Sequence, residues 1–245
     1  IVCIKEFVLF QTILDIIYPV RCPICGEIVI PKENKICGPC KDQLQYITEP
    51  RCKKCSKPIE QEDKEYCSDC EHKNYHFRHG YAIWVYDETM RQSIAGFKYH
   101  NKREYAKFYI EEILRIYGDE IKKISPDAIV PIPLHKSKYR ERGYNQAEIL
   151  ACGLGKRLGI PALSHLLIRN KKTLPQKQLS DRERLQNLRE AFEYNQAVAD
   201  DFHKEIKTIL LVDDIYTTGS TIEACTNELM SNGIKDIYFI TLCIG

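Results

Sequence analysis

Eight of the twelve cysteines in this 245-residue chain form a repeated pattern that restricts how the N-terminal third can fold. Segments 21–40 and 51–70 match at every cysteine with an offset of 30 residues. Each unit reads Cys-x-x-Cys, eleven residues, Cys-x-x-Cys. The cysteines are Cys22, Cys25, Cys37, Cys40, Cys52, Cys55, Cys67 and Cys70. Units this short and polar have little apolar core, so they need another source of folding free energy.

Structural zinc is the metal that this spacing favours. The tight turn of a Cys-x-x-Cys pair directs two thiolates at one ion, and two pairs complete a tetrahedral set of four sulfurs. We expect two zinc ions, one per unit, whose binding supplies most of the folding free energy. Crossed pairing between the units, or one lost site, stays open. Disulfides and an iron–sulfur cluster are the competing interpretations.

The remaining cysteines and the nearby histidines have no such spacing. Cys3, Cys152, Cys225 and Cys243 are expected to be small core residues. His72, His76 and His79 follow the second unit and could be extra ligands. With eight thiols available, a basic and aromatic surface junction is the preferred interpretation of these histidines.

Residues 1–19 are apolar but are interrupted by charged and polar side chains, and their spacing predicts an amphipathic helix ended by Pro19. A signal peptide is the alternative, but the basic start and the small-residue cleavage site are missing. No run of 18 apolar residues occurs, so we expect a cytoplasmic protein without membrane insertion. Three regions follow: the helix 1–19, a cysteine-rich double zinc-binding module 20–79, and a larger domain 80–245.

The larger domain alternates strand and helix patterns, which predicts an α/β fold with a parallel sheet flanked by helices. Strands are expected at 81–87, 127–134, 162–169, 208–214 and 236–243. Helices are expected at 103–118, ended by Gly118, and at 145–159 and 221–233. Ligands of such sheets bind beyond the carboxyl ends of the strands.

The segment ILLVDDIYTTGST, residues 209–221, combines a strand end with two acids and a phosphate-type loop. Gly219 permits close backbone approach, and free N–H groups at the following helix start favour an anion. No Walker sequence is present, so an ATPase is not expected. Two carboxylates would repel a phosphate, but they accept hydrogen bonds from sugar hydroxyls. A ribose 5-phosphate fits both parts. The competing interpretation is an ordinary turn in which Asp213 caps the helix.

This segment resembles the phosphoribosyl-pyrophosphate (PRPP) signature of type I phosphoribosyltransferases. The whole chain resembles the ComF family, competence-associated proteins that join a zinc module to such a domain. Segments 133–148 and 171–192 and the double cysteine unit carry the likeness. The resemblance implies the type I phosphoribosyltransferase fold.

The resemblance also implies roles for individual residues. Asp213 and Asp214 would meet the ribose hydroxyls. The 5-phosphate would be bound by Thr217, Thr218, Gly219, Ser220 and Thr221. The loop containing Pro131, Ile132 and Pro133 would approach the pyrophosphate, and Mg²⁺ would be held largely by PRPP itself. Thr217 stands where purine-salvage enzymes carry an aspartate base, so 6-oxopurine salvage is not supported.

The near-neutral total charge of +2 hides a basic region, with thirteen Lys and Arg against five acids between residues 131 and 190. Cations there would assist the departure of pyrophosphate; the candidates are His135, Lys136, Lys138, Arg140 and Arg142. Segment 169–184 is long and polar and is expected to be a flap over the site, with Arg169, Gln176, Arg182 and Arg184 as candidate contacts.

Tyr139 and Tyr144, interleaved with these cations, are also typical of single-stranded DNA binding, and a solvated basic face is the alternative. Upstream, Phe97, Lys98 and Tyr99 are either site contacts or residues of the core or of a surface helix. We therefore expect a PRPP- and Mg²⁺-binding protein of natural competence that contacts single-stranded DNA and other competence proteins. The alternatives are an active transferase with an unknown acceptor and a non-catalytic PRPP sensor.

Overall fold

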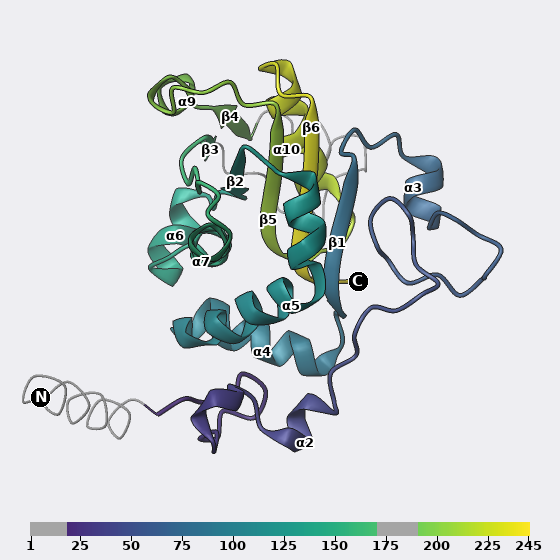
Figure 1. Ribbon diagram of the computed structural model, residues 1–245, viewed down its shortest axis with the longest axis vertical. Helices are drawn as coiled ribbons and strands as arrows, with labels where there is room; N and C mark the ends of the chain where they lie inside the picture. Colours follow the sequence, from purple (N-terminus) through teal and green to yellow (C-terminus); the bar gives the residue numbers. More distant parts are fainter. Residues whose placement is uncertain (1–18, 171–190) are drawn as a thin grey trace, which may run out of the picture.

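The computed structural model describes residues 19–170 and 191–245 (Figure 1). The predicted N-terminal helix, Cys3, Gln176, Arg182 and Arg184 lie outside the described residues. None of the helices in the described ranges is long and apolar enough to cross a membrane.

A four-stranded parallel sheet forms the centre of the larger domain, with the strand order β1-β6-β5-β2. The strands are β1 (His79–Val85), β2 (Ala128–Pro131), β5 (Thr208–Tyr216) and β6 (Asp236–Ile244). Its register places Ile209 between Ala128 and Ile237. The continuous apolar run at the start of β5 is typical of a central parallel strand, because both of its faces are covered. The predicted fold class, a helix-flanked parallel sheet preceded by a small zinc-ribbon module, is confirmed.

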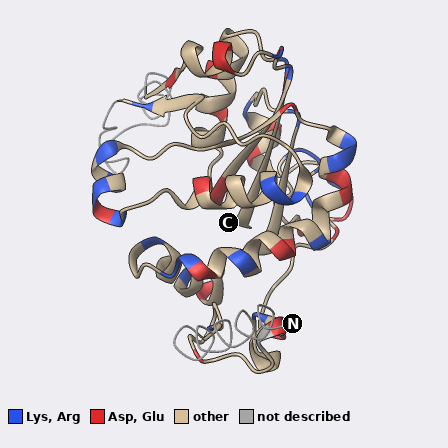
Figure 2. Cartoon of the chain, turned by 60° about the vertical axis from the view of Figure 1, so that its left-hand side comes forward, with Lys and Arg blue, Asp and Glu red and all other residues tan. Residues whose placement is uncertain are grey.

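Helices cover both faces of this sheet (Figure 1). Leu210 and Val212 belong to the core cluster that contains α4 (Glu88–Tyr99), α5 (Ala106–Ile124) and α7 (Gln146–Leu158). Ile209 and Leu211 belong to the cluster on the other face, with α10 (Ser220–Ser231). Successive strand side chains point to opposite faces, so one apolar run supplies both layers. Charged residues lie mainly on the helices and connections, whereas the strands are mostly uncharged (Figure 2).

Shorter elements complete the described chain. They are η1 (Lys32–Asn34), α2 (Gly38–Lys41), α3 (Ser68–His72), η2 (Arg103–Tyr105), α6 (Lys136–Arg142), β3 (Leu167–Arg169), β4 (Phe192–Tyr194) and α9 (Gln196–Asp201). β3 and β4 form a separate antiparallel pair.

The predicted strand 162–169 is mostly wrong. Only Leu167–Arg169 is a strand, and it pairs with β4 outside the central sheet. Ala162 makes a single bridge to Ile129, and the chain then turns at residues 164–165. Ser164 and His165 interrupt the apolar run at this turn, because polar side chains favour turns over buried strands.

Two helices differ from what the sequence predicts. α5 does not end at Gly118 but continues to Ile124, and Ser125 follows with a left-handed φ of 49°. Ile121 is buried one turn beyond Tyr117, so the apolar face extends past the glycine. The sequence leaves a helix open only around residues 97–99, whereas α4 begins at Glu88, where the Asp87 carboxylate caps it by accepting from the Met90 N–H at 2.8 Å.

The isolated cysteines divide into two groups. Cys225 and Cys243 are buried core residues, as predicted. Cys152 is exposed, so its predicted core role is wrong. It lies on the outer side of α7, whose buried residues include Leu150, Ala151 and Leu154.

Candidate functional site

The loop between β5 and α10 has the geometry of an anion-binding turn. Gly219 adopts a φ of 73°, in the left-handed region, immediately before the first helical residue Ser220. Thr217 and Thr218 are exposed, and the Thr218 hydroxyl lies 3.0 Å from that of Ser220. A small cavity of about 40 Å³ is lined by Asp213 and residues 215–222. The hydroxyls and the N–H groups of the first turn of α10 are suited to phosphate oxygens.

The two carboxylates lie beside this loop in different environments. The Asp214 Oδ1 forms an ion pair with the Lys98 Nζ at 2.7 Å, and both side chains are largely buried. The Asp214 backbone N–H donates to the Asp213 Oδ1 at 2.8 Å. Burial and the neighbouring Asp214 charge raise the pKa of Asp213 to about 7, although Lys98 opposes the shift. Asp213 can therefore accept or share a proton near neutral pH.

The loop after β2 runs alongside the carboxylates. Pro131 pairs with Val212 in the sheet, and the Ile132 N–H donates to the Val212 carbonyl at 2.9 Å. Pro131, Ile132 and Pro133 are all buried. The Asn145 side chain donates to the Ile132 carbonyl at 3.0 Å and so fixes this loop to the start of α7.

Cations gather on the same side of the sheet. Lys138 is exposed on α6. Its pKa is lowered by partial desolvation and by the positive charges of Arg142, Arg169 and Lys98, while the Asp214 charge opposes the shift. Arg142 donates to Gln146 at 2.9 Å, and its guanidinium stacks over the Tyr99 ring at 4.9 Å. Such a concentration of positive charge attracts a polyanionic ligand.

The other predicted basic contacts differ in their local roles. The His135 Nδ1 accepts from the Ser137 N–H at 3.2 Å and so caps α6. Lys136 and Arg140 are exposed on α6. Arg169 ends β3, and its guanidinium lies 5.2 Å from the centre of the Phe192 ring. Asp213 is among the charges that act on Arg169, so this arginine faces the carboxylate side of the site.

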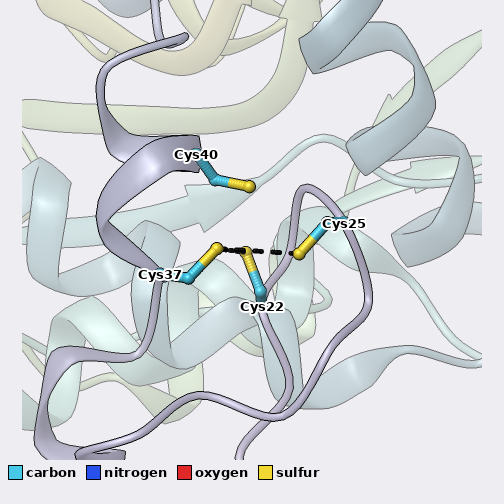
Figure 3. A group of neighbouring side chains, drawn as sticks. All are labelled: Cys22, Cys25, Cys37 and Cys40. Atoms are coloured by element: carbon cyan, nitrogen blue, oxygen red, sulfur yellow. Dashed lines mark hydrogen bonds between the residues drawn. The ribbon is translucent and has the colours of Figure 1, made fainter.

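The first four-cysteine group converges on one point (Figure 3). The Cys37 Sγ lies 3.6 Å from the Sγ atoms of Cys22 and Cys25, and Cys40 completes the group. A tetrahedron with zinc–sulfur bonds of about 2.3 Å has sulfur–sulfur edges of about 3.8 Å. These residues therefore fit one structural zinc ion.

The second group repeats this geometry. Cys52, Cys55, Cys67 and Cys70 have sulfur atoms within 4.8 Å of one another, and the Sγ atoms of Cys55 and Cys67 are 3.7 Å apart. Thus the two sites form within the units and not between them, and together they fit two zinc ions. The turns also correspond: Gly26 has a φ of 77°, and Ser56, 30 residues later, has a φ of 68°.

The three histidines do not join the described four-cysteine groups. His72 is exposed at the end of α3, and the His79 Nδ1 bonds to the Lys53 carbonyl at 2.7 Å. The His76 imidazole contacts the Glu223 carboxylate, and the His76 backbone N–H donates to it at 2.9 Å. The predicted surface junction is confirmed only for the exposed His72 and His76. It is wrong for the aromatic residues of the junction, because Tyr75 and Phe77 are buried. His76 also connects the cysteine module to α10.

Two parts of the site were missed or left undecided from the sequence. Lys98 is a site contact, whereas Phe97 is buried in the core. The spacing of Met90, Ile94 and Phe97 behind Asp87 was the available signal for α4. Tyr75 and His76 contact α10 and the loop before it, which lie more than 140 positions away in the sequence. No local sequence pattern predicts this contact.

A cavity of about 480 Å³ lies apart from these residues, between the first cysteine unit and the start of α5. Arg21, Lys35, Lys102 and Lys107 contribute its cationic lining. It shares no lining residue with the β5–α10 loop.

Known proteins are similar in sequence to this chain over most of its length. Residues 13–71 match the family model of the double zinc ribbon domain. Competence protein F of Haemophilus influenzae is 31% identical over 226 residues, which cover 89% of this chain and 93% of that protein. This chain belongs to the ComF family.

Further relatives of this ComF-family chain match over most of its length. Competence protein ComFC of Bacillus subtilis is 27% identical over 84% of this chain and 82% of that protein. DNA utilization protein YhgH of Salmonella typhimurium is 26% identical over 92% of this chain and 97% of that protein. A solved purine phosphoribosyltransferase from Pyrococcus horikoshii aligns with 55% of this chain and 72% of that chain, at 19% identity and a TM-score of 0.34. That likeness is too weak to bear on function.

Proposed function

We propose that this ComF-family protein binds PRPP with Mg²⁺ at the β5–α10 loop and acts in natural competence by handling single-stranded DNA. The observation that carries the PRPP assignment is the juxtaposition of an anion-binding turn with two carboxylates and a group of cations. Each part matches one part of the ligand. The turn suits the 5-phosphate, the carboxylates suit the ribose hydroxyls, and the cations suit the pyrophosphate, which would carry the Mg²⁺.

Calorimetry with PRPP and MgCl₂ tests the binding site. The wild-type protein should bind, and the double variant Asp213→Asn/Asp214→Asn should lose most of the affinity, because amides are weaker acceptors for the ribose hydroxyls. The exposed Asp201→Asn is the matched control and should bind as the wild type does. Absence of wild-type binding at millimolar PRPP would refute the assignment.

The DNA role is supported by the names of the relatives and by one surface feature. The competence and DNA utilization proteins match this chain over most of its length. Of the two tyrosines predicted to stack with bases, Tyr139 is 48% exposed, but Tyr144 is buried, so its predicted role is wrong. Tyr99 is 55% exposed and lies against Arg142 of α6, the helix that carries Tyr139. Exposed aromatic rings between cations can stack with bases while the cations contact phosphates. PRPP and single-stranded DNA would then approach the same face of the domain.

Titration of single-stranded oligonucleotides at several salt concentrations tests this face. Lys136→Gln should reduce the slope of log K against log salt by about 0.7. Tyr139→Ala should weaken binding by roughly 1–3 kcal/mol with little change in slope. Tyr66→Ala, which removes an exposed tyrosine of the second cysteine unit, is the control. Equal losses for Tyr66 and Tyr139 would exclude the proposed face.

Transfer and sensing are the alternative outcomes of PRPP binding. Transfer breaks the bond between ribose C1 and the pyrophosphate oxygen and joins C1 to an acceptor. Pyrophosphate release that requires an added acceptor would establish a transferase, whereas a sensor binds PRPP and releases none. Thr217 cannot act as a general base, so an acceptor would have to be a good nucleophile already or be activated elsewhere.

A further inference from the structure

Residues 71–78 connect the second cysteine unit to β1. This connector contacts the β5–α10 loop, here called the phosphate loop, on both sides of Gly219. The Tyr75 hydroxyl donates to the Thr218 carbonyl at 2.6 Å. The His76 backbone N–H donates to the Glu223 carboxylate at 2.9 Å, and the His76 ring contacts the same carboxylate. One bond therefore precedes the glycine, and the others hold the first turn of the following helix.

The side chains of Tyr216 and Tyr75 pack against Gly219 of this loop. A Cβ atom at Gly219 would lie 2.3 Å from the Tyr216 hydroxyl oxygen and 3.1 Å from the Tyr75 Cζ. Tyr75 is 7% exposed and Tyr216 is 2% exposed. Tyr216 belongs to β5, but Tyr75 comes from the cysteine module. The left-handed conformation of Gly219 thus fits a space that the larger domain does not enclose by itself.

The position of Tyr75 depends in turn on the second unit. Tyr75 stacks on Phe77 with ring centres 5.2 Å apart, and both belong to the buried cluster that contains Cys52 and Cys55. The buried Ser56 hydroxyl donates to the Gly80 carbonyl of β1 at 2.7 Å. A small unit with four converging thiols takes its folding free energy from the metal. Tyr75 therefore packs in the same buried cluster as two of the four thiols that would hold the metal.

The first unit has different contacts. Cys22 and Cys40 belong to the core cluster on the opposite face of the sheet. Tyr46, in the segment that follows this unit, donates to the Glu112 carboxylate of α5 at 2.6 Å. The hydrogen bonds of Tyr46 and Tyr75 thus have the same length. The acceptor of Tyr46 lies on α5, which is far from the phosphate loop in the sequence.

We propose that the second cysteine unit is a positioning element for the phosphate loop, with Tyr75 as the residue that connects the metal-dependent fold to Thr218 and Gly219. PRPP affinity then depends on the metal loading of the second unit and much less on that of the first. This inference rests on the proposed PRPP site. It states that PRPP binding is regulated by whether zinc occupies the site formed by Cys52, Cys55, Cys67 and Cys70.

Tyr75→Phe and Tyr46→Phe form a matched pair of variants in the full-length, zinc-loaded protein. Each removes one hydroxyl with a 2.6 Å bond to the larger domain and keeps the ring. Calorimetry with PRPP and MgCl₂ should give roughly three- to tenfold weaker binding for Tyr75→Phe, as expected for one hydrogen bond. Tyr46→Phe should bind within twofold of the wild type, and both should retain two zinc ions. Wild-type affinity for Tyr75→Phe, or equal losses for both variants, would overturn the inference.

Hydrogen exchange without ligand keeps the inference testable if PRPP does not bind. The amides of residues 217–221 should exchange several-fold faster in Tyr75→Phe than in the wild type or in Tyr46→Phe. Cys67→Ser should have a larger effect on these amides than Cys37→Ser, its counterpart 30 residues earlier. Absence of PRPP binding by the wild type refutes the proposed function, whereas unchanged exchange at 217–221 refutes the positioning role.

Discussion

At the scale of single residues, the site combines charges that a stable core would avoid. Asp213 and Asp214 are adjacent, and only Lys98 forms a described ion pair with either of them. Both the burial of Asp213 and the repulsion between the two acids oppose folding with two charged carboxylates. Such an arrangement is typical of a binding site, where ligand hydroxyls and cations complete the set.

The raised pKa of Asp213 predicts a pH-dependent stability. The folded protein keeps a proton on Asp213 up to about pH 7, whereas the ordinary value is 3.8. Between these values the folded state binds more protons, so the free energy of unfolding falls as pH rises. Asp213→Asn should flatten this dependence and raise the melting temperature at pH 8 by at least about 3 °C. Thermal unfolding between pH 4.5 and 8, with the exposed Asp201→Asn as control, measures it; parallel curves would contradict the assignment.

The ion pair between Lys98 and Asp214 predicts a coupling between α4 and β5. Lys98→Met should destabilise the protein by roughly 3 kcal/mol, because it leaves a largely buried carboxylate without its partner. Adding Asp214→Asn should recover much of this loss. Denaturant unfolding of both single variants and the double variant gives the coupling energy, and Lys123→Met, an exposed position, is the control. Additive single effects would show that the pair is not coupled.

At the scale of elements, the two cysteine units share one backbone plan. The Cys22 N–H donates to the Glu27 carbonyl at 2.8 Å, and the Cys52 N–H donates to the Lys57 carbonyl at the same distance. The residue after each knuckle is left-handed, but it is a glycine in the first unit and Ser56 in the second. The serine tolerates this conformation because its hydroxyl is bonded to Gly80.

Substitutions of Gly26 and Ser56 should therefore lower the stability of the units by amounts that follow a defined order. Gly26→Ala should destabilise the first unit by roughly 1–2 kcal/mol, because a Cβ disfavours the left-handed region. Ser56→Ala should be more damaging than Ser56→Gly, since alanine loses the bond to Gly80 and keeps the strain, whereas glycine loses only the bond. Thermal unfolding together with zinc release to a chromogenic chelator measures the order. A more stable Ser56→Ala than Ser56→Gly would show that backbone strain is unimportant here.

At the scale of the whole molecule, the two units belong to core clusters on opposite faces of the sheet. The first unit and the segment after it pack against α4 and α5, and the connector after the second unit contacts α10 and the β5–α10 loop. In Figure 1 the first unit lies below α4, and the second lies beside β1 with α3. The two cysteine units are similar in sequence but pack against different parts of the larger domain.

Metal analysis should reflect this arrangement. The purified protein should hold about two zinc ions, Cys37→Ser or Cys67→Ser about one, and the double variant about none. Because the units share no cysteine and pack on different faces, loss of one ion should leave the affinity of the other within about threefold. Loss of both ions in either single variant would show that the units fold as one. Iron in place of zinc would overturn the metal assignment.

Local spacing alone determined the four-thiol units, the alternation of strands and helices, and the two acids of β5 followed by a glycine turn. These features depend on residues close together in the chain, where turn geometry and side-chain periodicity decide the structure. The predicted strand at 162–169 was wrong because Ser164 and His165 form a turn, which is a local preference. The predicted helix end at Gly118 was wrong because the burial of Ile121 outweighs the local preference of the glycine. Only the tertiary structure decided that Lys98 faces Asp214 and that Tyr75 lies behind Gly219. Both contacts join segments more than 100 residues apart, and burial against the folded sheet selects them.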